Sequence, residues 1–290
     1  MRTASTLRRA VSDASAPKPH CERQDPSYGR AVRLMTATLD NRHFYEETVF
    51  DDWASRTPLT ETEGVLVDRF LDEHHSTVEA GTGAGRILLN LHGRGFVDLH
   101  GFDYVPGFID IAKTRDQSGS IAFTVQDAVD LDYPDAHFEQ AIYLQQVLCF
   151  IEDPADRFRA MQEARSVLRP GGTALFSFLC YEARMNRALY SAFAKYLRVH
   201  RLFRHRDVSL QYQPWLKTVD KPNLGALADR KPYVYWYRFR EALDSLVGAG
   251  FSVTWVGSTA QVGDDTWLCE PQRLYPSALD GMLYVVCRRR

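Results

Sequence analysis

Short apolar runs alternate with amphipathic segments between residues 76 and 180, and this alternation is the clearest pattern in the sequence. Runs rich in β-branched and aromatic side chains predict strands, whereas apolar residues at helical spacing predict helices. The predicted strands cover residues 76–81, 96–103, 120–127, 138–146 and 173–181, and the predicted helices cover 84–94, 105–115 and 153–168, the last closed by RPGG. Strands and helices in this order predict a parallel sheet covered on both faces.

The pattern resumes near the end of the chain after a long gap. The sequence FREALDSLVGAGF at 239–251 predicts a helix closed by Gly248 and Gly250. Two apolar runs, at 252–258 and 282–290, predict two final strands.

A helical cover is expected before the first strand, within residues 26–75. Residues 28–54 show loosely helical spacing, and residues 60–74 show it more clearly. The sequence TETE predicts a capping box with Thr60 as N-cap and Glu63 three residues later. The expected buried stripe of this helix is Val65, Val67, Phe70 and Leu71.

The gap at 181–238 is too long for a simple connection in a compact α/β domain. It predicts a lid or substrate-binding insertion, assigned to residues 181–236, with an amphipathic helix at 184–206 followed by an aromatic-rich stretch. The apolar face of this helix is expected to carry Met185, Leu189, Phe193, Tyr196 and Phe203.

The same helix is strongly basic, with seven Lys and Arg residues against one acid, Glu182, between residues 181 and 206. One interpretation is a solvated basic side of an amphipathic helix. The functional alternatives are attraction or clamping of an anionic acceptor, docking of a carrier protein, and contact with a membrane surface.

Composition narrows the class of protein. The chain has 290 residues, 45% hydrophobic and 25% charged, with a formal net charge of −2, so no global basic field favours nucleic acid as a partner. No apolar run approaches the roughly twenty residues of a transmembrane helix. Five cysteines without a CxxC pair indicate a reducing, cytoplasmic location and no zinc or redox centre.

The first 25 residues are rich in Ala, Ser and Pro and predict a disordered leader. They lack the continuous apolar region of a secretory signal peptide. A transit peptide is the alternative, because the segment has Arg and Ser and almost no acids.

The candidate chemistry begins at TVEAGTGAGR, residues 77–86, directly after a predicted strand and at the start of a helix. Glycines there let a ligand approach main-chain N–H groups at a helix N-terminus. A dinucleotide-binding GxGxxG register would start at Gly81 and require a small residue where Arg86 stands. An acid two residues before the first glycine, Glu79, is also foreign to that motif.

The form E-x-G-x-G-x-G resembles the first motif of the class I S-adenosylmethionine-dependent methyltransferases. Further positions agree in order: Asp103 ends the second strand and Asp127 follows the third. FEQAIYLQQVLCFIEDP resembles the fourth strand and the helix after it, VLRPGGTALFSF the turn into the fifth strand, and REALDSLVGAGF the helix before the sixth. The resemblance covers residues 60–180 and 237–290.

The resemblance implies an α/β Rossmann-like fold, with a mostly parallel seven-stranded sheet formed by residues 76–180 and 237–290. It implies S-adenosylmethionine as cofactor, with Asp103 on the ribose hydroxyls, Glu79 toward the amino-acid end, and Asp127 or its neighbouring backbone at the adenine. The residues expected to bind the cofactor are Glu79, Gly81, Gly83, Gly85, Asp103, Tyr104, Asp127, Ala128 and Gln145.

Absent motifs restrict the methyl acceptor. Enzymes of the family that methylate exocyclic amines of bases carry N/D-P-P-Y after strand four, where this chain has residues 143–146, YLQQ. The family's cytosine-C5 enzymes use a Pro-Cys nucleophile, whereas Cys149 follows Leu148 and is expected to be a packed thiol. No acid stands where catechol-type relatives bind magnesium, so no metal is expected.

The general base is left open. Many small-molecule relatives have a histidine near the position of Phe150. Its absence leaves two alternatives: an intrinsically nucleophilic acceptor such as an amine, or a base elsewhere in the chain. The candidates for that base are His43, His200 and His205.

Aromatic residues are the candidates for the acceptor pocket, because such walls bind flat or apolar molecules and amines. For individual side chains the alternative is a packed hinge between insertion and sheet. The expected acceptor contacts are Tyr28, Phe150, Tyr181, Tyr212, Trp215, Tyr235, Trp236 and Tyr237.

The resulting prediction is metal-independent methyl transfer to an O or N nucleophile of a small molecule, of the secondary-metabolite type. Two alternatives stay open: action on RNA, lipid or a carrier-bound substrate through the basic helix, and a cofactor-binding protein that is not a methyltransferase. The oligomeric state is not predicted.

Overall fold

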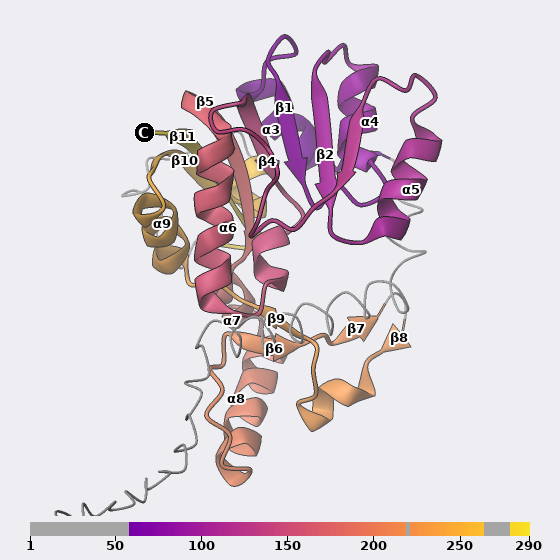
Figure 1. Cartoon of the computed structure of the whole chain (residues 1–290). Coiled ribbons are helices and arrows are strands. Elements are labelled where there is room, and N and C mark those ends of the chain that lie inside the picture. The colour runs from indigo at the N-terminus through magenta and orange to yellow at the C-terminus, as the bar shows by residue number, and fades with distance from the viewer. Residues whose placement is uncertain (1–57, 219–220, 264–278) are drawn as a thin grey trace, which may run out of the picture.

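A seven-stranded sheet forms the centre of the computed structural model, which describes residues 58–218, 221–263 and 279–290 (Figure 1). The strand order is β10-β11-β5-β4-β1-β2-β3. The strands are β1 (Thr77–Ala80), β2 (Leu99–Asp103), β3 (Ala122–Val125), β4 (Phe138–Tyr143), β5 (Leu168–Leu179), β10 (Phe251–Ser258) and β11 (Met282–Arg289).

The sheet is mostly parallel, as the sequence predicts. Strands β1 to β5 pair in parallel, and β11 runs antiparallel to both β5 and β10. Strand β1 lies between β2 and β4, so the order of the connections reverses there. In open α/β sheets such a switch point forms a ligand-binding crevice at the carboxyl ends of the strands.

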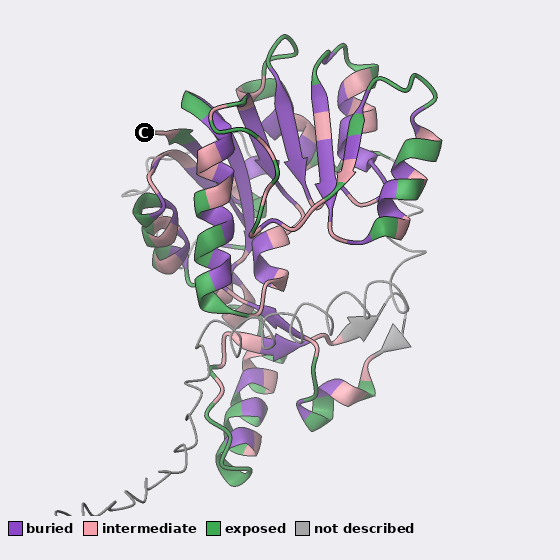
Figure 2. Cartoon of the chain, in the orientation of Figure 1, coloured by how far each residue is buried: buried purple, intermediate pink, exposed green. Residues whose placement is uncertain are grey.

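Helices cover both faces of the sheet and enclose two apolar layers. One layer packs under α6 (Pro154–Val167) and α9 (Phe239–Gly248), and the other under α3 (Glu61–Phe70), α4 (Arg86–Gly93) and α5 (Pro106–Arg115). Successive strand residues point to opposite layers, because side chains alternate along a strand. Figure 2 shows the resulting buried sheet between half-exposed helices.

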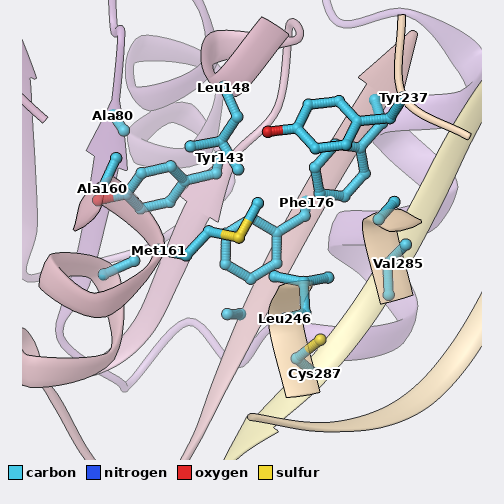
Figure 3. Close-up of a cluster of buried hydrophobic side chains, with 14 of the residues drawn as sticks. Ala80, Tyr143, Leu148, Ala160, Met161, Phe176, Tyr237, Leu246, Val285 and Cys287 are labelled. Carbon is cyan, nitrogen blue, oxygen red and sulfur yellow. The ribbon is translucent and has the colours of Figure 1, made fainter. Parts of the chain in front are cut away.

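Strand β4 illustrates this division. Tyr143 belongs to the layer under α6, where it lies near Phe176 and Met161 (Figure 3), whereas Ile142 belongs to the opposite layer. A strand buried on both faces is apolar throughout rather than alternating, which explains the continuous apolar runs in the sequence.

Helix α3 confirms the predicted capping box, and all four residues of the predicted stripe pack in or against the apolar layer on that face of the sheet. Thr60 is the N-cap, its side chain accepts from the Glu63 N–H, and Glu63 accepts from the Thr60 N–H at 2.8 Å. The helix ends at Phe70, and Glu63 and Leu66 are buried with Val67, whereas Val65 remains half-exposed. The buried face is wider than predicted, because Leu66 packs in the core and Glu63 turns inward to a partner on α4.

The predicted RPGG segment follows the end of α6 at Val167 and forms part of β5. Pairing between β4 and β5 moves from Phe138–Leu168 to Gln140–Thr173, so residues 169–172 form a bulge. Strands β4 and β5 pair with each other both before and after this bulge.

The insertion leaves and rejoins the sheet at neighbouring residues. The Tyr237 N–H donates to the Leu179 carbonyl at 2.9 Å, and the Tyr181 N–H donates to the Tyr237 carbonyl at 2.8 Å. Between these points lie α7 (Tyr181–Met185), α8 (Ala188–Phe203), two short antiparallel ribbons and a 3-10 helix. The ribbons pair β6 (Tyr212–Pro214) with β9 (Tyr233–Tyr235) and β7 (Lys217–Thr218) with β8 (Lys221–Pro222); the 3-10 helix is Leu224–Ala228.

Helix α8 projects away from the sheet, and its buried face is not the predicted one (Figure 1). Leu189 and Phe203 are 76% and 79% exposed. Ala194, Leu197 and Arg201 face inward instead. The reason is that Arg201 forms a buried ion pair with Asp229, with N–O distances of 2.7 and 2.8 Å.

The predicted leader at 1–25 and the expected helical residues 28–54 lie outside the described residues. Within the described part of the chain, no helix is both long and apolar enough to cross a bilayer.

Candidate functional site

The glycine loop joins the carboxyl end of β1 to α4. Gly81, Gly83 and Gly85 all have positive φ, at 60°, 53° and 79°. A Cβ on Gly81 would lie 2.7 Å from a Val147 side-chain carbon, whereas a Cβ on Gly83 would meet no heavy atom of the described residues within 4 Å. The backbone at Gly83 is therefore open to a ligand, at the N-terminus of a helix.

Asp103 connects the end of β2 to this loop. Its Oδ2 accepts from the Gly83 N–H at 3.0 Å, and its Oδ1 accepts from the Val105 N–H at 3.0 Å. The residue is 7% exposed. The acid at the end of β2 is thereby held beside the glycine loop.

Glu79 is the second acid of the site and is only 3% exposed. Its carboxylate accepts from Thr82 Oγ1 at 2.6 Å. Burial raises the pKa of Glu79 to about 8, against the lowering effects of the Thr82 hydrogen bond and the Arg86 charge. A cationic ligand group beside this carboxyl would favour its ionised form.

A buried ion pair behind the loop was not predicted from the sequence. Arg86 donates to both oxygens of Glu63, each at 2.7 Å, and Gln145 Nε2 forms a very short contact with Glu63 Oε1. Arg86 is the residue that breaks the dinucleotide motif, and Glu63 is the capping-box acid. The sequence singles out both Arg86 and Glu63, but nothing in the local pattern predicts that the two side chains meet.

The other predicted cofactor residues lie around the same edge of the sheet. Asp127 follows β3, and its Oδ1 accepts from the Val129 N–H at 3.2 Å. Ala128 is buried and Tyr104 half-buried. Gln145 follows β4 with φ of 58°, and Gln146 has φ of 62°. Two consecutive left-handed residues other than glycine are uncommon and often mark functional turns.

A 3-10 helix, Val147–Phe150, links the glycine loop to the insertion. Val147 is the residue closest to Gly81, and the Phe150 ring stacks on the Trp215 ring with centroids 5.3 Å apart. Two predicted acceptor residues are thus brought together beside the loop.

Three other predicted acceptor residues surround Arg157 on α6 instead. The Arg157 guanidinium lies 3.6 Å from the Tyr235 ring centroid, 5.4 Å from Tyr212 and 5.7 Å from Tyr237. Tyr237 is 2% exposed and packs on Phe178 with centroids 4.8 Å apart. The prediction that Tyr237 lines the acceptor pocket is therefore corrected: it is a core residue of the hinge, because the insertion folds back onto the sheet there.

Tyr181 and Trp236 remain at the junction and contact arginines. The Arg238 guanidinium lies 5.3 Å from the Tyr181 ring centroid, and the Arg184 guanidinium lies 3.9 Å from that of Trp236. Both rings are half-exposed.

The structure does not bring the candidate histidines to the glycine loop. His200 lies in the last turn of α8, with its ring against Tyr196, and His205 follows the end of this helix, which projects away from the sheet (Figure 1). The prediction of either as general base is not supported by their placement. His43 and Tyr28 lie outside the described residues.

Cys149 is buried, as predicted for a packed thiol. Its Sγ accepts from the Leu179 N–H at 3.3 Å, and burial raises its pKa to about 12. A thiol in this state is a poor nucleophile.

Much of the basic charge of the insertion is neutralised internally. Arg201 and Arg206 both bind Asp229, and Arg187 binds Asp280 at 3.0 Å. Arg201 is buried and therefore not available to an external polyanion, whereas Arg187 and Arg206 are paired but remain exposed.

Comparisons with known proteins agree with this geometry. A family model described as a methyltransferase domain matches residues 78–176. A comparison with curated protein sequences finds no match.

Solved structures with the same fold include three methyltransferases. The S-adenosylmethionine-dependent methyltransferase from Methanosarcina mazei is 18% identical, with a TM-score of 0.57 and coverage of 77% of this chain and 96% of that one. The one from Mesorhizobium loti is 19% identical, with a TM-score of 0.53 and coverage of 79% and 98%. The CcbJ methyltransferase from Streptomyces caelestis is 14% identical, with a TM-score of 0.55 and coverage of 83% and 94%.

Proposed function

Because the chain belongs to the class I S-adenosylmethionine-dependent methyltransferase superfamily, we propose that it transfers the methyl group of this cofactor to an O or N nucleophile of a small molecule, without a metal. The observation that carries the proposal is the open backbone at Gly83 beside two buried acids, Glu79 and Asp103. Glu79 lies near the carboxyl end of β1, which flanks the switch point between β1 and β4, and Asp103 ends β2 on the other side of β1.

The residues fit the cofactor's chemistry. S-adenosylmethionine carries a ribose diol, a cationic amino group and a cationic sulfonium, and it supplies an electrophilic methyl group when bound. Asp103 offers a carboxylate that accepts hydrogen bonds from two vicinal hydroxyls. Glu79 offers a buried carboxyl with a raised pKa, which a neighbouring cation would stabilise in its charged form.

The protein's contribution to the reaction is alignment and exclusion of water. The insertion supplies Trp215, on which the Phe150 ring stacks, and lies beside the carboxyl ends of the sheet strands (Figure 1). Methyl transfer from a sulfonium dissipates charge, so positioning and desolvation are sufficient for a nucleophilic acceptor. An amine needs no general base once it is deprotonated, which is consistent with the distant positions of His200 and His205.

The experiment that tests the cofactor assignment is calorimetric titration of the purified protein with S-adenosylmethionine and, separately, with NADH. Saturable binding of S-adenosylmethionine alone is expected. Binding of NADH alone would contradict the proposal. Product analysis with methyl-labelled cofactor and a panel of amines, phenols and carboxylic acids then separates a methyltransferase from a protein that only binds the cofactor.

Replacing Asp103 tests the site itself. Asp103→Ala removes the expected contact with two hydroxyls and should weaken S-adenosylmethionine binding by about 1.5–3 kcal/mol. The measurement is the dissociation constant by calorimetry. Asp98→Ala, at the exposed start of the same strand region, is the matched control and should bind as the wild type does. Unchanged affinity in Asp103→Ala would contradict the assignment.

A further inference from the structure

Arg184 in α7 is held in one place by three neighbours. Its guanidinium carbon lies 4.1 Å from the Tyr190 ring centroid and 3.9 Å from that of Trp236. Its Nε donates to Gln213 Oε1 at 2.8 Å, and Gln213 is itself fully buried. Stacked arginines of this kind present a fixed hydrogen-bonding fork.

Within the described residues this arginine has neither a carboxylate nor a backbone carbonyl as partner, whereas each of the other buried arginines has one or the other. Arg86 binds Glu63 and Arg201 binds Asp229, and Arg157 donates to two backbone carbonyls. Burial lowers the pKa of Arg184 to about 10, and the one compensating interaction is with Tyr190. A largely buried charge without a partner is costly, so its partner is expected to come from outside the protein.

The free side of the fork is accessible. The two Nη nitrogens of Arg184 have no hydrogen-bond partner among the described residues, and they are absent from the set of fully buried, unpartnered atoms there. They therefore reach the solvent, while Nε and the faces of the guanidinium are occupied.

The position of Arg184 places it on the acceptor side of the site. Helix α7 begins directly after the carboxyl end of β5. The Leu179 N–H at that end donates to Cys149, in the 3-10 helix that contacts the glycine loop through Val147. Arg184 thus lies on the insertion's side of the edge that holds Glu79 and Asp103.

We propose that Arg184 determines the specificity for the acceptor by binding a carboxylate group of it through Nη1 and Nη2. The inference rests on the proposed function, since it names the class of acceptor for that site. Two parallel N–H···O bonds match the geometry of a carboxylate. A single unpaired guanidinium matches a monoanion, because the nearby Arg187 is already paired with Asp280.

The test is a ligand-observed NMR titration of the full-length protein with three matched probes: benzoate, benzamide and phenyl phosphate. Benzoate should bind saturably, and benzamide at least about tenfold more weakly, because a charged bidentate contact is lost. Arg184→Gln should weaken benzoate binding by about 10- to 100-fold and leave benzamide unchanged. Arg198→Gln, on the exposed side of α8, should bind benzoate as the wild type does.

Three results would overturn the proposal: no saturable benzoate binding by the wild type, equal benzoate binding by Arg184→Gln, or tighter binding of phenyl phosphate than of benzoate. If Arg184→Gln does not fold, phenylglyoxal modification of the wild type replaces it. Peptide mass spectrometry should then show that benzoate, but not benzamide, protects Arg184, while Arg198 reacts equally in both. The proposal would likewise be overturned if phenylglyoxal modified Arg184 to the same extent with and without benzoate.

A parallel calorimetric titration with S-adenosylmethionine separates this inference from the proposed function. Arg184→Gln should bind the cofactor as the wild type does, because Arg184 contacts no residue of the glycine loop. Failure of the wild type to bind the cofactor would contradict the proposed function. Normal cofactor binding without benzoate selectivity in the wild type, or with that selectivity retained in Arg184→Gln, would contradict only the role of Arg184.

Discussion

Glu79 and Asp103 end neighbouring strands, yet their surroundings give them different electrostatic roles. Asp103 accepts two backbone N–H bonds, which stabilise a carboxylate. Glu79 accepts one hydroxyl and is almost completely buried, so its proton is retained to about pH 8. A cationic ligand beside Glu79 would therefore favour the ionised form of this carboxyl.

Glu79 should make the free protein less stable as the pH rises. Its pKa is higher in the folded state, about 8, than the ordinary 4.5, so the folded state binds more protons between these values. The stabilisation is complete below about pH 4.5 and lost as the pH rises through about 8. The free energy of unfolding by urea should fall by about 2 kcal/mol more between pH 5.5 and 7.5 in the wild type than in Glu79→Gln.

Thr82→Val provides the control for this effect. This substitution removes the hydroxyl that lowers the pKa of Glu79, so that pKa should rise further. The free energy of unfolding of Thr82→Val should therefore still fall steeply with pH at neutral pH. Equal pH dependence in the wild type and Glu79→Gln would show that Glu79 is ionised in both states and would contradict the prediction.

At the scale of elements, the ion pair between Glu63 in α3 and Arg86 at the start of α4 attaches α3 to the end of the glycine loop. Burial alone would raise the pKa of Glu63, but the hydrogen bonds and charge of Arg86 outweigh it and lower that pKa. The contribution of the pair is therefore present at neutral pH and is lost as the pH falls below the ordinary range of glutamate.

Breaking this pair from one side should be strongly destabilising. Arg86→Met leaves Glu63 buried without its partner and should lower the free energy of unfolding by about 3–5 kcal/mol. The double variant Glu63→Gln with Arg86→Met should recover most of that loss. Arg94→Met removes the exposed pair with Asp68 and should cost no more than about 1 kcal/mol. A double variant as unstable as Arg86→Met would indicate a packing effect rather than an unpaired charge.

At the scale of the whole molecule, the described residues form a sheet domain and an insertion that joins it where Tyr181 and Tyr237 pair beside the end of β5. Arg157 on α6 contacts the rings of Tyr212 in β6 and Tyr235 in β9. Asp229 accepts from Arg201 in α8 and from Arg206, which follows that helix. These contacts lie within the insertion or at its base, away from the glycine loop (Figure 1).

Loosening the insertion should leave cofactor binding intact. Asp229→Asn removes the anion between two arginines and should raise amide hydrogen exchange in β6 and β9 by about 100-fold, because a buried charge network is broken. The dissociation constant for S-adenosylmethionine should stay within about twofold of the wild type. Asp280→Asn, whose pair with Arg187 is exposed, is the control and should change neither. A large loss of cofactor affinity in Asp229→Asn would show that the insertion also organises the cofactor side.

The sequence alone determined the elements whose cause is local. Apolar runs buried on both faces predict the strands of the sheet, Thr60 and Glu63 predict a helix start, and the glycine spacing predicts a tight loop at a helix N-terminus. The resemblance added the cofactor and the acid at the end of β2. These features depend on residues within one or two turns of the chain, so periodicity and spacing are sufficient to find them.

Only the tertiary structure decided which distant side chains meet. Glu63, Arg86 and Gln145 come from three elements, and the outward face of α8 follows from the burial of Arg201 against Asp229 rather than from its apolar pattern. Tyr237 became a core residue and Arg184 an unpaired cation for the same reason. A buried charge or ring takes its role from the partner that packing brings to it, and that partner lies too far along the chain for local pattern to specify.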